Sequence, residues 1–199
     1  MEGDLAMLTD NQILENKAKW LELCSKLNFD MTELVKYLDA VNYWEAPFSA
    51  TENYAYKGGL VEYTLKFVNE LGILCNAYKP GVYSAEDILK VGLFKEIYRG
   101  ELYEPYERNV KNNDTGMWEK VQAYKIRDQR ATYGSTGFSS YMTIQHFYKD
   151  FTDEQIEAIV QTNTKQDVSD DPYEILKSYP LIPLVKMAMT VVLYLDIEK

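Results

Sequence analysis

The chain has 199 residues, of which 46% are hydrophobic and 14% aromatic, so it is long enough for one globular domain and too apolar for a disordered chain. A formal net charge of -10 argues against general nucleic-acid binding through a basic surface. The charge is unevenly distributed, because residues 95–130 carry eight Lys or Arg against seven Asp or Glu. The composition therefore still allows a local cationic site for a small anionic molecule.

The sequence near residue 1 lacks a basic segment followed by an apolar run, so no secretory signal is expected. The longest apolar run, residues 187–195, is far shorter than the roughly 20 residues that cross a bilayer. Cys24 and Cys75 lie in separate apolar helical patterns rather than in a Cys-x-x-Cys pair, which favours reduced, buried thiols. We therefore expect a cytoplasmic protein with no membrane partner.

Two helices are predicted before Pro47. Thr9, Asp10 or Asn11 is a candidate cap for the first, which extends to about Leu27. Asp30 and Glu33 resemble a capping box at the start of the second. We expect this pair, within residues 1–45, to pack on a main domain formed by residues 46–199.

The main domain is predicted to begin with two further helices. An amphipathic stretch from Leu60 to Tyr78 follows Gly58-Gly59, and Tyr63 lies on its apolar face. Ser84 is a candidate cap for the next helix, which includes residues 90–99. We take residues 90–99 as the segment around which the chain is organised. In this stretch an apolar pattern continues directly into charged residues, and Gly92 permits close helix approach.

The helical period disappears between residues 103 and 126. Turn formers at residues 112–116 separate two short runs, residues 106–111 and 117–126, which predicts a β-hairpin. Helices are expected again at residues 139–147, 152–161 and 183–196. The predicted fold class is thus mostly α, with a small hairpin insertion.

Five segments carry a resemblance to a known family, and they occur in the family's order. Residues 46–49, 56–65, 92–99, 108–112 and 133–137 resemble the Ala-Pro-x-Ser, Tyr-x-Gly-Gly-Leu-x-Glu-His-Ser-Leu, Gly-Leu-Leu-His-Asp-Ile-x-Lys, Arg-Asn-Val-Lys and Gly-x-His-Gly motifs of HD-domain phosphohydrolases. The small HD-domain proteins of phages and prophages are particularly similar. The resemblance, from about Ala46 to Asp196, implies an HD-domain-like helical bundle and a phage protein in the host cytoplasm.

The resemblance also implies that the metal site has been lost. The positions of the family's metal-binding histidines are occupied by Asn53, Tyr63, Lys95, Thr136 and Thr162. Its aspartates fall at Glu96 and Asp196, and only Asp196 keeps its identity. Such a metal site needs imidazoles and carboxylates. The only histidine in the chain is His146, which is expected to be a partly exposed helix histidine. The implied protein is a pseudoenzyme with no catalytic residues, metal or cofactor.

A pocket without a metal would bind a ligand instead of cleaving it. The predicted phosphate partners are Lys95, Arg99, Arg108 and Lys111, with hydroxyls from Ser135, Thr136 and Thr162. Tyr63 and Tyr133 are candidates to stack on a base, although Tyr63 fits core packing equally well. Glu96 or Asp196 would accept a hydrogen bond from a ribose hydroxyl or a base amine.

Three functions follow from this sequence. The first is a binding protein that sequesters a nucleotide or cyclic-nucleotide signal used in antiphage defence. The second is an inhibitor that presents the acidic run of residues 150–171 to a host or defence enzyme. The third is a residual metal-dependent phosphohydrolase. The expected partner is an anionic small molecule, and a homo-oligomer is also compatible with the sequence.

Overall fold

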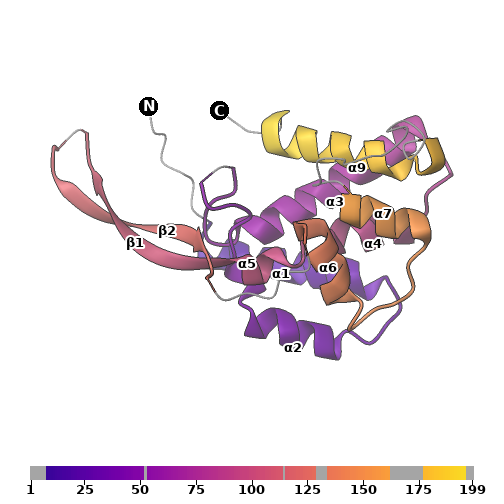
Figure 1. The fold of residues 1–199 in the computed structure, drawn as a ribbon, viewed down its shortest axis with the longest axis horizontal. Coiled ribbons are helices and arrows are strands. Elements are labelled where there is room, and N and C mark those ends of the chain that lie inside the picture. Colours follow the sequence, from indigo (N-terminus) through magenta and orange to yellow (C-terminus); the bar gives the residue numbers. More distant parts are fainter. Residues whose placement is uncertain (1–7, 52, 114, 129–133, 162–176, 196–199) are drawn as a thin grey trace.

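The computed structural model describes residues 8–51, 53–113, 115–128, 134–161 and 177–195. These residues form a mostly helical body from which one two-stranded antiparallel hairpin projects (Figure 1). The prediction of a mostly α fold with a small hairpin is therefore confirmed. None of the described helices has the length and apolar character that crossing a bilayer requires.

The N-terminal helices start close to the predicted positions. Helix α1 spans Asp10–Ser25, and Thr9 caps it through a capping box with Gln12. Helix α2 spans Thr32–Ala40, but the predicted capping box is absent, since Asp30 accepts a hydrogen bond from the Thr32 N–H instead. A short 3-10 helix, η1, follows at Tyr43–Glu45.

Helices α3 (Gly59–Tyr78) and α4 (Ala85–Phe94) pack directly against each other. Ser84 caps α4 as predicted, and Asp87 completes its capping box. At Gly92 a side chain would bring its Cβ within 2.6 Å of Val68 on α3. The absence of a side chain at Gly92 is therefore what allows the two helices to approach so closely.

Helix α4 ends earlier than predicted. It stops at Phe94, and residues 95–98 form turns closed by i to i+3 hydrogen bonds before the short helix α5 (Arg99–Leu102). The chain therefore changes direction at the position where the charged residues begin. Lys95 keeps helical backbone angles and its N–H still donates to the Val91 carbonyl, and both Lys95 and Glu96 are buried.

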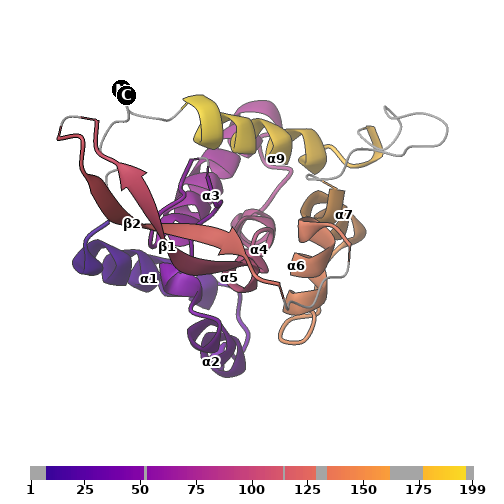
Figure 2. The same ribbon diagram turned by 60° about the vertical axis from the view of Figure 1, so that its left-hand side comes forward.

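The hairpin comprises β1 (Tyr103–Lys111) and β2 (Trp118–Ile126), joined by the predicted turn. Strand β1 begins three residues before the predicted run and includes Pro105, which lies opposite Tyr124. Figure 2 shows the hairpin crossing in front of the helical body, with its turn far from the helices.

The C-terminal elements complete the helical body. Helix α6 spans Thr136–Ile144 and α7 spans Asp153–Val160, each capped by the preceding Ser or Thr. Helix α9 (Leu181–Thr190) lies along α3 and continues into a π-helical turn, η3 (Val191–Leu195). His146 is exposed in the turn after α6, which corrects its predicted position inside a helix.

A single cluster of buried side chains runs through the body. Trp20 of α1 is fully buried and contacts the rings of Tyr43, Trp44 and Phe94 edge to face. The N-terminal helices thus share their core with α3 and α4. Cys24 and Cys75 are buried free thiols, as predicted.

Candidate functional site

The charged residues after α4 form a buried ion cluster. Lys95 is fully buried, and its Nζ lies 2.6 Å from Oε1 of Glu96, which is itself 2% exposed. The Nε of Arg99 pairs with the other Glu96 oxygen, Oε2. Both carboxylate oxygens of Glu96 are therefore engaged by cations, and the Lys95 ammonium is directed at Glu96 and shielded from solvent.

The pKa values of both Lys95 and Glu96 are lowered in the ion cluster. Burial lowers the pKa of Lys95, against the attraction of Glu96. Burial also opposes the ionisation of Glu96, but the positive charges of Lys95 and Arg99, with their hydrogen bonds, outweigh it and lower the pKa of Glu96 to about 2. Glu96 is thus a carboxylate at every physiological pH.

Arg99 connects the ion cluster to neighbouring elements. One of its terminal nitrogens, Nη1, donates to the Phe48 carbonyl oxygen at 2.9 Å and to the Tyr103 hydroxyl at 3.2 Å. Its guanidinium also lies 4.2 Å from the centre of the Phe48 ring. Arg99 therefore ties the cluster to the loop before α3 and to the first residue of the hairpin.

Tyr63 lies in the core rather than at an open pocket. It is fully buried, and its ring packs against Phe48 and Phe67, with centroids 3.9 and 5.8 Å away. Among the described residues its hydroxyl has no hydrogen-bond partner. The neighbouring rings leave no space for a base, so the structure supports the core-packing alternative for Tyr63.

Two predicted phosphate partners lie far from the ion cluster. Arg108 and Lys111 are on β1, five and eight residues beyond Tyr103. At about 3.3 Å per residue these positions are roughly 17 and 26 Å along the strand. The prediction that they join Lys95 around one anion is corrected, because the hairpin projects away from the body (Figure 1).

Of the remaining predicted residues, some take part in the local fold and the others lie outside the described residues. Ser135 caps α6 by accepting a hydrogen bond from the Phe138 N–H, and Thr136 is the first residue of that helix. Asn53 donates a side-chain hydrogen bond to the Leu193 carbonyl. Tyr133, Thr162 and Asp196 lie outside the described residues.

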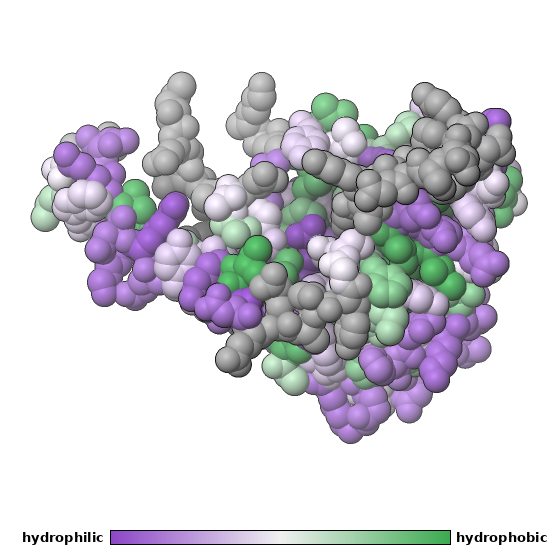
Figure 3. Space-filling model, viewed as in Figure 1, coloured by the Kyte–Doolittle hydropathy of each residue, from purple (hydrophilic) through white to green (hydrophobic). Residues whose placement is uncertain are grey.

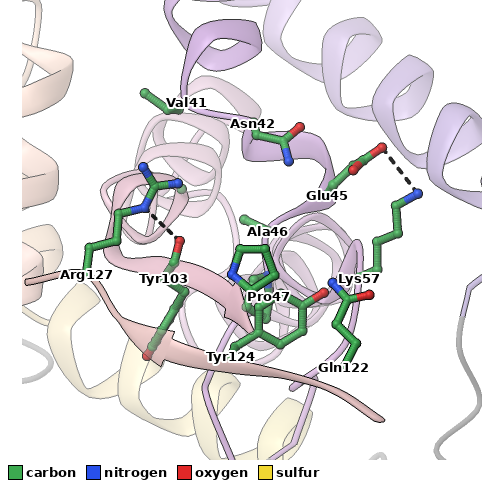
Figure 4. Close-up of a pocket in the computed structure, with 12 residues that line it drawn as sticks. Val41, Asn42, Glu45, Ala46, Pro47, Lys57, Tyr103, Gln122, Tyr124 and Arg127 are labelled. Carbon is green, nitrogen blue, oxygen red and sulfur yellow. Dashed lines mark hydrogen bonds and ion pairs between the residues drawn. The ribbon is translucent and has the colours of Figure 1, made fainter. Parts of the chain in front are cut away.

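An open cavity lies at the base of the hairpin, next to the ion cluster. Its volume is about 290 Å³. It is bounded by the segment around η1 and by both strands (Figure 4). The polar residues that line it are Asn42, Glu45, Lys57, Gln122 and Arg127.

The cavity carries a cation on each side. Arg127 donates through Nε to the Tyr103 carbonyl at 2.9 Å. On the other side Lys57 pairs with Glu45 at 3.3 Å and with Asp10 at 2.9 Å. Pro47 and the ring of Tyr124 lie between the two cations (Figure 4). Burial raises the pKa of Tyr124, so its hydroxyl stays protonated.

Tyr103 joins the cavity and the ion cluster. Its hydroxyl accepts a hydrogen bond from Arg99, and its carbonyl accepts one from Arg127. None of the cavity's polar residues was predicted as a site residue. A weak sequence signal existed for Arg127, which belongs to the locally basic segment, but Asn42, with a φ of 59°, gave none.

Within the described part of the chain, no three His, Cys, Asp or Glu side chains are grouped closely enough to hold a metal ion. Comparison with known proteins gave no match to a family model, to a curated protein or to a solved structure.

Proposed function

We propose that the protein is a non-hydrolytic binding protein that sequesters a nucleotide, and that the nucleotide occupies the cavity at the hairpin base. The observation that carries this proposal is that a guanidinium and two side-chain amides line one small, partly apolar cavity. Arg127, whose Nε donates to the Tyr103 carbonyl, would contribute a charge-assisted contact to a phosphate.

The other walls suit the rest of a nucleotide. Pro47 and Tyr124 offer flat apolar surfaces to a sugar or base, while Asn42 and Gln122 offer both donors and acceptors to base edges. Glu45 would accept a hydrogen bond from an amine or ribose hydroxyl. This arrangement keeps the predicted ligand class and moves the site from Lys95 to the neighbouring cavity.

The volume of the cavity limits the size of the ligand that it can hold. Pockets for small molecules typically measure about 300–1,000 Å³, and this cavity of about 290 Å³ is at the lower end. One nucleoside monophosphate or cyclic mononucleotide suits that volume, whereas a cyclic dinucleotide is about twice as large. The proposal is therefore a mononucleotide ligand.

The residues beside the cavity support binding without hydrolysis. The resemblance to HD-domain phosphohydrolases assigns metal ligands to positions 95 and 96, where the chain has an ammonium and a carboxylate paired with each other. An ammonium hydrogen-bonded to the carboxylate competes with a divalent cation for the same oxygens. On this proposal the chain is a pseudoenzyme related to that family.

The first test is to identify and titrate a ligand. Small molecules co-purified with the full chain would be identified by mass spectrometry, and nucleoside monophosphates, cyclic mononucleotides and cyclic dinucleotides would be titrated by calorimetry. We expect at least one mononucleotide to bind more tightly than any cyclic dinucleotide. A panel in which no nucleotide binds with a Kd below about 1 mM contradicts the proposal and leaves inhibition of a protein partner as the better function.

A matched pair of variants tests the location. Arg127→Gln removes the cavity guanidinium and should weaken binding about tenfold, because it deletes a charge-assisted hydrogen bond. Arg108→Gln makes the same chemical change on exposed β1 and should leave the Kd unchanged. Circular dichroism would confirm that both variants fold. Equal affinities for Arg127→Gln and the parent would place the ligand elsewhere.

A further inference from the structure

Among the described residues, β2 pairs with β1 alone, so no described strand pairs with its outer edge. At the two ends of the hairpin, the Asn112 N–H donates to the Met117 carbonyl and the Arg127 N–H donates to the Leu102 carbonyl. Hydrogen-bonded and non-hydrogen-bonded pairs alternate along an antiparallel ladder. The backbone groups of five β2 residues therefore point away from β1, namely Trp118, Lys120, Gln122, Tyr124 and Ile126.

These outward groups have no backbone partner in the part of the chain that the structure describes. A two-stranded hairpin is only marginally stable in water unless further strands or a helix cover it. Large apolar side chains are also exposed at both ends of β2, with Trp118 70% and Ile126 47% exposed. Hydrophobic residues are visible at intervals along the otherwise hydrophilic hairpin (Figure 3).

We propose that β2 pairs with β2 of a second copy of this chain, antiparallel and centred on Gln122, to form a four-stranded sheet across a symmetric dimer. Gln122 is the middle residue of the nine-residue strand. A two-fold axis at this residue is therefore the one that pairs β2 over its whole length. The outward-pointing residues also face one another in this register, as ladder hydrogen bonds require.

The residues brought together in this register are complementary. Trp118 lies opposite Ile126 of the second copy, so the two exposed apolar residues cover each other. Glu119 lies opposite Lys125, which places opposite charges in cross-strand contact at two symmetric positions. Gln122 meets its own copy, and an amide side chain can both donate and accept there.

Charge favours this part of the chain as the contact surface. Residues 103–126 carry four Lys or Arg and four Asp or Glu, so the hairpin is neutral in a chain of net charge -10. Two acidic bodies repel each other least when their contact is a neutral arm that keeps them apart. Strand β1 is less suitable, because Pro105 has no N–H to donate on its outer edge.

The dimer would also extend the hairpin-base cavity. The turn end of one hairpin would lie beside the base of the other, since the strands run antiparallel. Trp118 of one copy would then approach Ile126 of the second, next to the cavity residue Arg127. The dimer does not depend on the proposed nucleotide, and its test needs no ligand.

Sedimentation velocity of the full chain tests the proposal with two proline variants. Lys120→Pro removes an outward N–H of β2, and Asn109→Pro removes the outward N–H of the residue directly opposite on β1. Neither change removes a backbone hydrogen bond between β1 and β2, although Lys120→Pro also removes the exposed side-chain bond from Lys120 Nζ to Glu107 on β1. At about 50 µM the parent should sediment as a dimer, Lys120→Pro should raise the dimer Kd at least about tenfold, and Asn109→Pro should behave like the parent.

A charge exchange provides an independent readout. Glu119→Lys and Lys125→Glu should each weaken the dimer, because each places like charges opposite one another. The double variant restores opposite charges and should recover most of the parent's dimerisation. A parent that stays monomeric, equal effects of the two proline variants, or a double variant weaker than both single variants would overturn the proposal.

Discussion

The ion cluster and the hairpin-base cavity contain the same kinds of charged group and differ in burial. In the cluster, Lys95 and Glu96 are at most 2% exposed and neutralise each other. In the cavity, Lys57 and Glu45 form a similar pair whose side chains are 35% and 45% exposed. The cluster therefore fixes the fold, whereas the cavity can exchange its contacts with water for contacts with a ligand.

This difference follows from the cost of removing charges from water. A buried ion is tolerated only when its partner stays in place, so exchanging Glu96 for a ligand phosphate would leave a buried charge uncompensated. An exposed pair loses little when it separates, because water and salt ions solvate both groups. Cations that bind ligands in this chain are therefore expected in the cavity.

The largest predicted effect is on stability, from Glu96→Ala. The substitution leaves Lys95 buried without its partner and removes one partner of Arg99. Breaking a buried ion pair in this way typically costs about 3–5 kcal/mol. Urea unfolding followed by circular dichroism would measure the loss, and a cost below about 1 kcal/mol would show that the cluster is more solvated than the structure indicates.

A second prediction concerns acid stability, with Glu96 as the group that titrates. Its pKa is lowered from 4.5 to about 2 in the folded state. Between these two pKa values Glu96 is ionised in the folded protein and protonated in the unfolded chain. The contribution of Glu96 to the free energy of unfolding is therefore fully present above about pH 5 and is lost as the pH falls toward 2. Between pH 5 and 3 the free energy of unfolding should fall more steeply in the parent than in Glu96→Gln. Parallel curves for the two proteins would contradict this assignment.

A third prediction tests the close contact between helices α3 and α4 at Gly92, which precedes the ion cluster in the sequence. Gly92→Ala would push a Cβ to within 2.6 Å of Val68, which should cost about 1–3 kcal/mol through overpacking. Gly72→Ala is the matched control in helix α3, because its added Cβ would meet no other part of the protein within 4 Å beyond its chain neighbours and the backbone of its own helix. There the change should stabilise by about 0.4–1 kcal/mol, because alanine is the better helix former. Chemical unfolding of both variants separates the two outcomes.

Local patterns in the sequence predicted most of the helix starts and the hairpin. Thr9, Ser84 and Thr152 cap helices at the expected places, because capping depends on residues only three positions apart. The turn at residues 112–116 is likewise set by its own residue types. Features with a local cause were therefore predictable.

The end of α4 and the cavity depend on distant parts of the chain. Lys95 continues the helical pattern in the sequence, and its burial becomes possible only because Glu96, Arg99 and the Phe48 carbonyl form a network. The cavity needs the hairpin to dock against the segment around Asn42, which is 85 residues before Arg127 in the sequence. No local pattern encodes which charged residue becomes buried and which lines a cavity.

The smallest predicted stability effect is at Lys57, the cavity counterpart of Lys95. Lys57→Gln removes the ion pairs with Asp10 and Glu45, both of which involve carboxylates with substantial solvent exposure. Exposed pairs contribute about 0–1 kcal/mol, and salt screens them further. Unfolding at low salt and at about 1 M NaCl should therefore differ little between the variant and the parent, and the small difference should shrink at high salt. A loss as large as that of Glu96→Ala would mean that Lys57 supports the fold as the ion cluster does, and would remove the distinction between the two regions.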